Sequence, residues 1–352
     1  MTKTAENVKK VGIVGHFGGN SSSYGGQTAK TRTVATELER RFGKERVNRI
    51  DTYGGIRAYL RVFFRLPSVL KSCDHFVMLP AHNGVKLLTP AILFWNAFYK
   101  KELHYVVIGG WLPNFLKKQK VLAKQLKKFH GIYVETNAMK RALEEQRFAN
   151  LFVVPNCKEL TPISVEEIVY QTQAPYRLCT FSRVMKQKGI EDAVSAVKRA
   201  NERYDAEVFA LDIYGLIDDG DKEWFENAQK NFPGYVQYRG KVPFSESVDV
   251  LKTYFALLFP TYYEGEGFAG TLIDAMSAGV PVIASDWKYN PEIVSEDIGF
   301  LFPTRDVDAF TEILCCIYED NSLINDKKET CLVKSRQYLP KNAMQVLIDN
   351  MQ

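Results

Sequence analysis

Residues 262–294, with the sequence YYEGEGFAGTLIDAMSAGVPVIASDWKYNPEIV, decide the fold of this chain. An apolar run at residues 254–259 precedes them and predicts a buried parallel strand that ends at Pro260. A glycine-rich loop follows, and apolar residues then recur at helical spacing up to Gly279, where we expect the helix to close. Pro281 opens the next predicted strand. This order is typical of an open α/β sheet, in which ligands bind at the carboxyl ends of the strands.

Two carboxylates lie within this stretch. Glu266 precedes the predicted helix, and Asp274 lies inside it, a little over two turns further on. Both side chains could therefore face one ligand, and the backbone N–H groups at the helix start favour a phosphate. The alternative is that Glu266 caps the helix and that Asp274 is solvated.

At these residues the chain resembles the retaining glycosyltransferases of the GT-B fold, the large family four. The resemblance is carried by EGFAGTLIDAM, which begins at Glu266, and by GVPVI, which begins at Gly279. It implies an α/β fold of two Rossmann-like domains that face each other across a cleft. It also implies that Glu266 contacts the donor sugar hydroxyls and that Asp274 contacts the ribose. The family has a second glutamate where this chain has Asp274, which is one methylene shorter.

Length and composition exclude several classes of protein. The 352 residues suit one or two domains, and 46% hydrophobic residues are ordinary for a globular chain. A net charge of +5 is too small to indicate nucleic-acid binding. The N-terminal residues are polar and do not form a signal peptide. The most apolar helix candidate, residues 87–99, is shorter than the roughly 20 residues that span a membrane.

The six cysteines show neither metal-binding nor disulfide spacing, and we expect core thiols in a reducing compartment. The predicted location is cytoplasmic, with peripheral attachment to the inner face of the plasma membrane as an extension of that prediction.

Residues 1–157 are expected to form the first domain. A strand at residues 11–14 leads into a loop of small residues that ends at Gly25 and Gly26, before a helix. The resemblance implies that this glycine pair lines the donor diphosphate. Asp51 follows the second strand, as a ribose-binding acid does in NAD enzymes, but the glycine spacing is not that of the dinucleotide fingerprint.

One histidine of this domain is a candidate for the acceptor site. His82 lies in a predicted loop after the strand at residues 75–79; the alternative is a loop histidine without a function. Many members of the resembled family place a histidine after the fourth strand. Gly110 and Trp111 stand there in this chain, and we therefore assign no catalytic histidine.

Two basic segments of this domain are notable. Residues 114–130 contain six lysines beside an apolar face, which predicts one basic amphipathic helix. This helix would lie on an anionic membrane surface, or pack on the sheet with its lysines in water. A second predicted helix, residues 54–71, carries Arg57, Arg61 and Arg65 on one face, where the plain interpretation is a solvated basic stripe.

The composition of the sequence changes after residue 157. Residues 158–175 are polar and interrupted by prolines, which predicts an interdomain linker. Residues 176–334 are expected to form the second domain, and residues 335–352 a helix that returns towards the first. Arg183 and Lys188 follow the strand at residues 176–181, and two cations in such a loop suit a diphosphate. The resemblance implies that they neutralise the departing nucleoside diphosphate.

Further donor contacts come from the resemblance alone: the backbone near Val242 would meet the nucleotide base, and the other predicted donor-binding residues are Gly215, Phe268, Ala269 and Gly270. The acidic triplet at residues 219–221 has the form of a metal site in sugar transferases of another fold. Because it directly precedes a predicted helix, a capping loop is the favoured interpretation. No metal site is predicted.

The sequence therefore predicts a retaining, metal-independent glycosyltransferase that uses a nucleotide-sugar, UDP- or GDP-linked, and no other cofactor. The expected acceptor is a saccharide, lipid-linked through a polyprenyl carrier, and an anionic membrane surface is a further expected partner. The GWLP and YYEGEGFAG segments resemble capsular and lipopolysaccharide transferases in particular. Two alternatives stay open: a nucleotide-sugar epimerase of the same architecture, and a donor-binding partner subunit without turnover.

Overall fold

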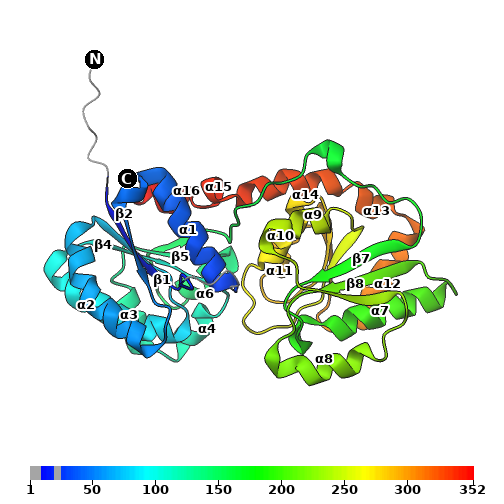
Figure 1. The fold of residues 1–352 in the computed structure, drawn as a ribbon, viewed down its shortest axis with the longest axis horizontal. Coiled ribbons are helices and arrows are strands. Elements are labelled where there is room, and N and C mark those ends of the chain that lie inside the picture. The colour runs from blue at the N-terminus through cyan, green and yellow to red at the C-terminus, as the bar shows by residue number, and fades with distance from the viewer. Residues whose placement is uncertain (1–8, 20–24) are drawn as a thin grey trace, which may run out of the picture. The chain divides into compact units, whose positions relative to one another are not determined.

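The computed structural model describes residues 9–19 and 25–352, and the chain divides into two compact units (Figure 1). Unit 1 comprises Met1–Glu159 together with Tyr338–Gln352, and unit 2 comprises Leu160–Gln337. Each unit contains one six-stranded sheet, and every strand pair in both sheets is parallel. The prediction of an α/β fold with two Rossmann-like sheets is therefore confirmed.

The sheet of unit 1 has the strand order β2-β1-β3-β4-β5-β6. Its strands are β1 (Val11–Gly15), β2 (Val47–Asp51), β3 (His75–Met78), β4 (Glu102–Val106), β5 (Gly131–Val134) and β6 (Leu151–Val153). The helices of unit 1 are α1 (Gly26–Phe42), α2 (Ile56–Ser72), α3 (His82–Tyr99), α4 (Leu112–Lys117), α5 (Lys120–Leu126), α6 (Asn137–Glu144), α15 (Pro340–Ala343) and α16 (Gln345–Asp349).

The chain of unit 1 reverses its direction across the sheet at β1. From β1 it crosses α1 to β2 on one side, and all later strands lie on the other side of β1. Since parallel crossovers are right-handed, α1 covers one face, and α2 to α6 cover the opposite face. The α1 face is completed by the C-terminal segment, whose Met344 and Leu347 share a buried core with Val34 and Leu38 of α1.

The sheet of unit 2 has the strand order β12-β11-β10-β7-β8-β9. Its strands are β7 (Tyr176–Phe181), β8 (Phe209–Tyr214), β9 (Val236–Gly240), β10 (Ala256–Phe259), β11 (Val282–Ser285) and β12 (Gly299–Phe302). The helices of unit 2 are α7 (Ile190–Arg203), α8 (Lys222–Gln229), α9 (Ser247–Leu251), α10 (Gly270–Ser277), α11 (Asn290–Ile293), α12 (Val307–Glu319), α13 (Ser322–Asn325) and α14 (Lys328–Ser335).

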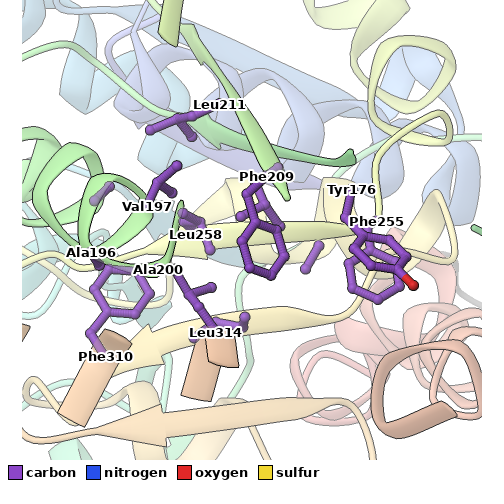
Figure 2. Packing of buried hydrophobic residues seen from close by; sticks show 14 of the residues in the cluster. Tyr176, Ala196, Val197, Ala200, Phe209, Leu211, Phe255, Leu258, Phe310 and Leu314 are labelled. Atoms are coloured by element: carbon purple, nitrogen blue, oxygen red, sulfur yellow. The ribbon is translucent and has the colours of Figure 1, made fainter. Parts of the chain in front are cut away.

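The core of unit 2 lies mainly between the sheet and the layer formed by α7, α8 and α12. Side chains of α7, β8, β10 and α12 gather there, with Val197 and Leu258 among them (Figure 2). Tyr176 stacks on Phe255, with 4.4 Å between the ring centroids. Strands buried on both faces read as continuous apolar runs, which is why residues 254–259 could be recognised in the sequence.

Local signals explain several element ends. The Thr136 hydroxyl accepts a hydrogen bond from the Met139 N–H and caps α6. Asp306 caps α12 in the same way, through the Ala309 N–H. Gly279 follows α10 with a φ of 64°, a left-handed conformation that suits glycine, and the predicted closure of this helix is confirmed.

Two sequence predictions in unit 1 are wrong. Residues 114–130 do not form one helix: α4 and α5 are separate, and Gln119 between them has a non-helical φ of −123° and ψ of 60°. Most of their apolar side chains, including Leu116, Leu122 and Leu126, are buried in the unit, and Val121 alone is highly exposed among those described, so the two helices present no continuous apolar face to a membrane. His82 is also not in a loop, because α3 begins at this residue.

Among the helices formed by residues 9–19 and 25–352, none combines the length and the apolar character that a membrane span requires.

Candidate active site

The candidate site of unit 2 lies at the point where the chain changes the direction in which it crosses the sheet. Strands β7 and β10 are neighbours, but the chain leaves β7 towards β8 and leaves β10 towards β11, on opposite sides. Loops diverge at such a switch point, and ligands of open α/β sheets bind there. The loop after β7 carries Arg183 and Lys188, and the loop after β10 carries Glu266. The three predicted catalytic side chains therefore lie on two adjacent loops.

Lys188 and Glu266 form a close ion pair between these loops. Each side chain is only 10% exposed, so solvent screens the pair weakly. The Thr261 hydroxyl donates a second hydrogen bond to the same carboxylate oxygen, Oε2, at 3.0 Å. The Lys188 ammonium also lies 5.4 Å and 5.3 Å from the ring centroids of Phe259 and Tyr263. The ammonium is therefore held by a carboxylate and two aromatic faces.

The two loops are held together by their backbones as well. The Tyr262 N–H donates to the Gln187 carbonyl at 2.8 Å. Gly189 has a φ of 71°, and a Cβ at this position would lie 2.1 Å from the Pro260 carbonyl oxygen. Only glycine permits this approach, which makes Gly189 a packing requirement of the site. The sequence did not reveal Thr261 as a partner of Glu266; its only signal is a hydroxyl directly after the strand-ending proline.

Arg183 is more accessible than Lys188. Its side chain is 54% exposed, and Nη1 donates to the Asp218 carboxylate at 3.2 Å. The other oxygen of Asp218 accepts from the Gly220 N–H, and Asp221 accepts from the Lys186 N–H. Asp218 caps the short 3-10 turn Asp219–Asp221, but the predicted capping of the following helix is wrong, because Asp221 at the start of α8 makes no side-chain capping hydrogen bond. These carboxylates also hold the loop that presents Arg183.

Asp274 is buried within α10 and accepts a hydrogen bond from the Ser247 hydroxyl at 2.9 Å. The interaction joins α10 to α9, so the solvated alternative for Asp274 is wrong. The alternative role of Glu266 as a helix cap is wrong as well. Ala269 occupies the capping position, where no side chain makes a capping hydrogen bond, and Gly270 begins the helix.

The remaining predicted donor residues of unit 2 have different environments. Phe268 is buried beside the start of α10. Gly215 follows β8 with a φ of 145°, and a Cβ there would lie 1.7 Å from the Ser182 carbonyl oxygen. Loop packing alone therefore requires this glycine. Val242 lies two residues beyond β9 and is half-buried. Gly215 and Val242 follow strands that end at the same edge of the sheet as β7 and β10.

The corresponding edge of unit 1 carries aromatic and imidazole groups. His82 begins α3 directly after β3, and its ring stacks on Trp111 with 4.0 Å between centroids. Burial, and secondarily the nearby Lys86 ammonium, lower the pKa of His82. Gly25 and Gly26 lie at the start of α1, and a Cβ at either would meet no heavy atom of the described residues within 4 Å. Their packing does not require glycine, whereas close approach of a ligand would.

Asp51 does not serve as a ribose-binding acid. Its carboxylate accepts hydrogen bonds from the N–H groups of Phe17, Gly19 and Tyr53, at 2.8–3.0 Å. The side chain therefore shapes the loop after β1, and the NAD-binding alternative loses its acid. His16 lies in the same loop and carries no sequence motif that marks it as a site residue. Its Nδ1 lies 2.7 Å from the Thr28 hydroxyl. It follows β1, which adjoins β3 at the switch point of unit 1.

Comparison with known proteins finds glycosyltransferases among the proteins that are similar to this chain. Residues 175–320 match the family model described as Glycosyl transferases group 1. The GtfA subunit of the UDP-N-acetylglucosamine–peptide N-acetylglucosaminyltransferase of Streptococcus gordonii is 26% identical over 190 residues, which are 53% of this chain but only 36% of that protein. The amylovoran biosynthesis glycosyltransferase AmsK of Erwinia amylovora is 26% identical, and the match covers 70% of this chain and 69% of AmsK.

Solved structures of similar fold cover the whole chain. Anabaena HepE in complex with UDP and glucose has a TM-score of 0.74 at 13% identity, over 97% of this chain and 98% of HepE. Pneumococcal GtfA in complex with UDP and GlcNAc has a TM-score of 0.63 at 20% identity, over 85% of this chain and 60% of GtfA. The predicted fold class is thus confirmed. The chain therefore has the GT-B fold, and its residues 175–320 match the Glycosyl transferases group 1 family model.

Proposed function

We propose that this protein is a glycosyltransferase that takes its sugar from a nucleotide-sugar bound at the carboxyl edge of the unit 2 sheet. The observation that carries the proposal is the convergence of Arg183, Lys188 and Glu266 on the loops after β7 and β10. Two cations and a carboxylate at a switch point suit a ligand that combines a diphosphate with a polyhydroxylated ring. The family match and the relatives named as glycosyltransferases support the same reaction class.

Each of the two cations forms an ion pair with an acidic side chain of the protein. Lys188 is paired with Glu266, and Arg183 with Asp218. A diphosphate brings negative charge and would draw both cations towards its oxygens. We propose that Lys188 exchanges its partner in this way, so that Glu266 becomes available to the sugar hydroxyls while Thr261 keeps its carboxylate oriented. The donor then replaces an internal ion pair with two interactions of its own.

The proposed reaction breaks the bond between the anomeric carbon of the donor and the diphosphate oxygen, which leaves with the electron pair. An acceptor hydroxyl forms the new bond to the same carbon, with retention of configuration, and its proton passes to the departing diphosphate oxygen. Negative charge on the diphosphate increases as the bond breaks, and Arg183 and Lys188 are placed to stabilise it electrostatically. The start of α10, formed by Ala269 and Gly270, would add backbone N–H donors at the same edge. This assignment gives no step to a metal ion.

The test is a thermal-shift panel of UDP-, GDP-, ADP- and dTDP-sugars, followed by chromatography of the products. One nucleotide should raise the melting temperature, because a ligand that binds only the native state stabilises it. The shift should diminish in Arg183→Ala, and sugar should pass to a saccharide acceptor. Release of an altered nucleotide-sugar without acceptor would instead indicate an epimerase. Binding without any turnover would indicate a partner subunit, and no binding at all would contradict the proposal.

We further propose that the acceptor is lipid-linked and that unit 1 lies on an anionic membrane surface. The lysine-rich segment, residues 114–130, gives this proposal little support, because most of its apolar side chains are buried. A different surface supports the proposal: the α2–α3 aromatic surface, formed by Leu60, Phe63, Phe64, Phe94 and Phe98, all of which are exposed. These rings contact one another through Trp95.

Charge favours a lipid occupant for this surface. The same helix, α2, exposes Arg57, Arg61 and Arg65. Anionic lipid attracts such residues by about 1 kcal/mol each, and exposed phenylalanines insert at the boundary between headgroups and acyl chains. A saccharide carried on a lipid would reach unit 1 at such a surface. The synthesis of a capsular or lipopolysaccharide-type surface polysaccharide is the process that we infer.

Co-sedimentation with vesicles tests the membrane part separately. The protein should bind phosphatidylglycerol-containing vesicles at low salt, and Phe64→Ser/Phe98→Ser should lower the partition at least about tenfold. The control is Val333→Ser on α14 of unit 2, where the native valine is 65% exposed, similar to Phe64 and Phe98. Equal partition of the double variant and the control would remove the membrane proposal and leave donor binding unaffected.

A peptide acceptor is a second candidate. The GtfA relatives are named as peptide N-acetylglucosaminyltransferase subunits, although the S. gordonii match spans only 36% of that protein. Transfer to a peptide, but not to a lipid-linked saccharide, would favour this candidate over the first.

A further inference from the structure

Three histidines and a glutamate gather at the amino ends of β3, β4 and β5, at the opposite edge of the unit 1 sheet from His82. His75 begins β3, Glu102 begins β4, and His104 lies two residues further along β4. His130 directly precedes β5. The parallel register pairs His75 with Glu102 and His104 with Gly131, which brings the four side chains to one edge.

The distances within this cluster match those of a metal coordination shell. His75 Nδ1 lies 3.1 Å from His104 Nε2 and 3.2 Å from Glu102 Oε2, and the same Glu102 oxygen lies 3.7 Å from His130 Nε2. One ligand atom from each of His75, Glu102 and His104 lies within 4.8 Å of the other two. Zinc binds imidazole and carboxylate at about 2.0–2.2 Å, so tetrahedral ligands lie roughly 3.3–3.5 Å apart.

An outer hydrogen bond orients one of the imidazoles. His104 Nδ1 lies 3.0 Å from the Tyr133 hydroxyl, which also accepts from the Asn350 side-chain amide at 3.2 Å. A proton on Nδ1 leaves the lone pair of Nε2 directed at the cluster. Metal-binding histidines usually have such a partner on their second nitrogen. Asn350 belongs to the C-terminal segment, so the outer contacts extend from β5 to the end of the chain.

Hydrogen bonding alone accounts poorly for this arrangement. His75 and His104 are buried. His75 Nδ1 lies within hydrogen-bond distance of both His104 Nε2 and Glu102 Oε2, and a single proton on Nδ1 would have to serve both. A cation would instead satisfy all the lone pairs that converge here, while the partly exposed Glu102 and His130 provide an entry path.

We propose that His75, Glu102, His104 and His130 bind one zinc ion. Imidazole nitrogens and a single carboxylate suit zinc, whereas magnesium and calcium prefer oxygen ligands. His75, Glu102 and His104 already have the spacing of metal ligands, and His130, close to Glu102, would have to turn its exposed ring towards the ion to complete the tetrahedral shell of a structural site. The ion would tie three neighbouring strands together at their amino ends, and through Tyr133 it would also hold the C-terminal segment. The proposal does not depend on the proposed transfer reaction.

The experiment uses the full chain without an affinity tag, after treatment with a chelator. Zinc is titrated in competition with a chromophoric chelator, bound metal is counted by elemental analysis, and the melting temperature is recorded with and without zinc. We expect one zinc per chain and a higher melting temperature in its presence. Magnesium at the same concentration should have no effect.

The variant Glu102→Gln/His130→Asn removes the two partly exposed ligands and leaves the buried histidines in place, so folding is retained. Its affinity for zinc should fall at least about 100-fold, and the zinc-dependent rise in melting temperature should vanish. The matched control, His82→Asn, lies at the other edge of the sheet and should bind zinc like the wild type. If the wild-type protein binds no more zinc than the double variant, the proposal is wrong.

Discussion

The two units share an α/β architecture with different strand orders, and they carry different chemistry at the point where the chain changes direction across each sheet. In both units, the chain adds strands first on one side of the starting strand and then on its other side. Polar residues follow the two neighbouring strands at which this change occurs. In unit 2 these residues are charged and paired, as in Lys188 with Glu266. In unit 1 they are imidazole and aromatic groups, such as His82 against Trp111. The fold therefore determines where a ligand can bind, and the loop sequences determine which ligand it is.

The largest expected effect concerns ion pairs. Lys188→Met would leave Glu266 without its cation in a nearly buried site, which should lower the free energy of unfolding by about 3–5 kcal/mol. Lys188→Met/Glu266→Gln should recover most of this loss, as measured by urea unfolding. In unit 1 the pair of Lys30 with Glu135, at 2.7 Å, is buried too, and Lys30→Met should cost a similar amount. Additive effects of the two unit 2 substitutions would contradict the coupling between the loops.

The second prediction separates binding from turnover. Glu266→Gln should lower kcat by a factor on the order of 10²–10³, because it removes a charge directed at the reacting sugar. Nucleoside diphosphate binding should persist or tighten, since Lys188 loses its internal partner. Glu264→Gln, a highly exposed neighbour in the same loop, is the control and should leave kcat unchanged. A proportional loss of nucleotide affinity in Glu266→Gln would instead give this residue a role in binding.

The third prediction compares two buried lysines. Lys30 has an acid partner, whereas Lys328 donates to the Tyr254 and Phe255 carbonyls, and burial lowers the pKa of Lys328 to about 8. The unfolded chain therefore binds more protons between pH 8 and 10.5, so this lysine makes stability rise with pH across that window, by about 3 kcal/mol in total. Wild type and Lys328→Met should therefore converge in this range when unfolding is measured at several pH values. Parallel pH curves would mean that the pKa of Lys328 is ordinary.

The smallest effects concern the exposed cation. Arg183→Ala should leave stability nearly unchanged, because its ion pair with Asp218 is largely solvated. It should weaken nucleoside diphosphate binding by roughly tenfold, through loss of a charged hydrogen-bond donor. Asp218→Asn should have the opposite effect and strengthen nucleoside diphosphate binding a few-fold at most. Arg183 then no longer has to break an ion pair with Asp218 in order to bind the diphosphate. Calorimetric titration measures both, and equal weakening by the two variants would show that Asp218 acts by positioning the loop.

The strands and helices of unit 2 could be predicted closely from the sequence. The expected strand at residues 176–181 is β7, without a change of bounds. Parallel strands covered on both faces are continuous apolar runs, and glycines mark the ends of their helices. The break at Gln119 could not be foreseen in the same way, because lysines and leucines continue across it at helical spacing.

The candidate site could be predicted as a set of residues but not as a set of contacts. Lys188 and Glu266 were both recognised, yet their pairing depends on the adjacency of β7 and β10, which a strand list does not specify. Ser247 and Thr261 carry no motif, and their hydroxyls became partners of Asp274 and Glu266 only in the folded chain. The cluster around His75 escaped notice because its residues come from separate strands.

Hydrogen exchange with and without a nucleotide-sugar tests the central claim most directly, because it reports which of the two units binds the donor. The account predicts protection of backbone amides in residues 182–189 and 261–272, the loops after β7 and β10 with the start of α10. It predicts no protection at the amino edge of the unit 1 sheet, around His75 and His104. Protection confined to unit 1, with the unit 2 loops unchanged by a saturating donor, would contradict the account.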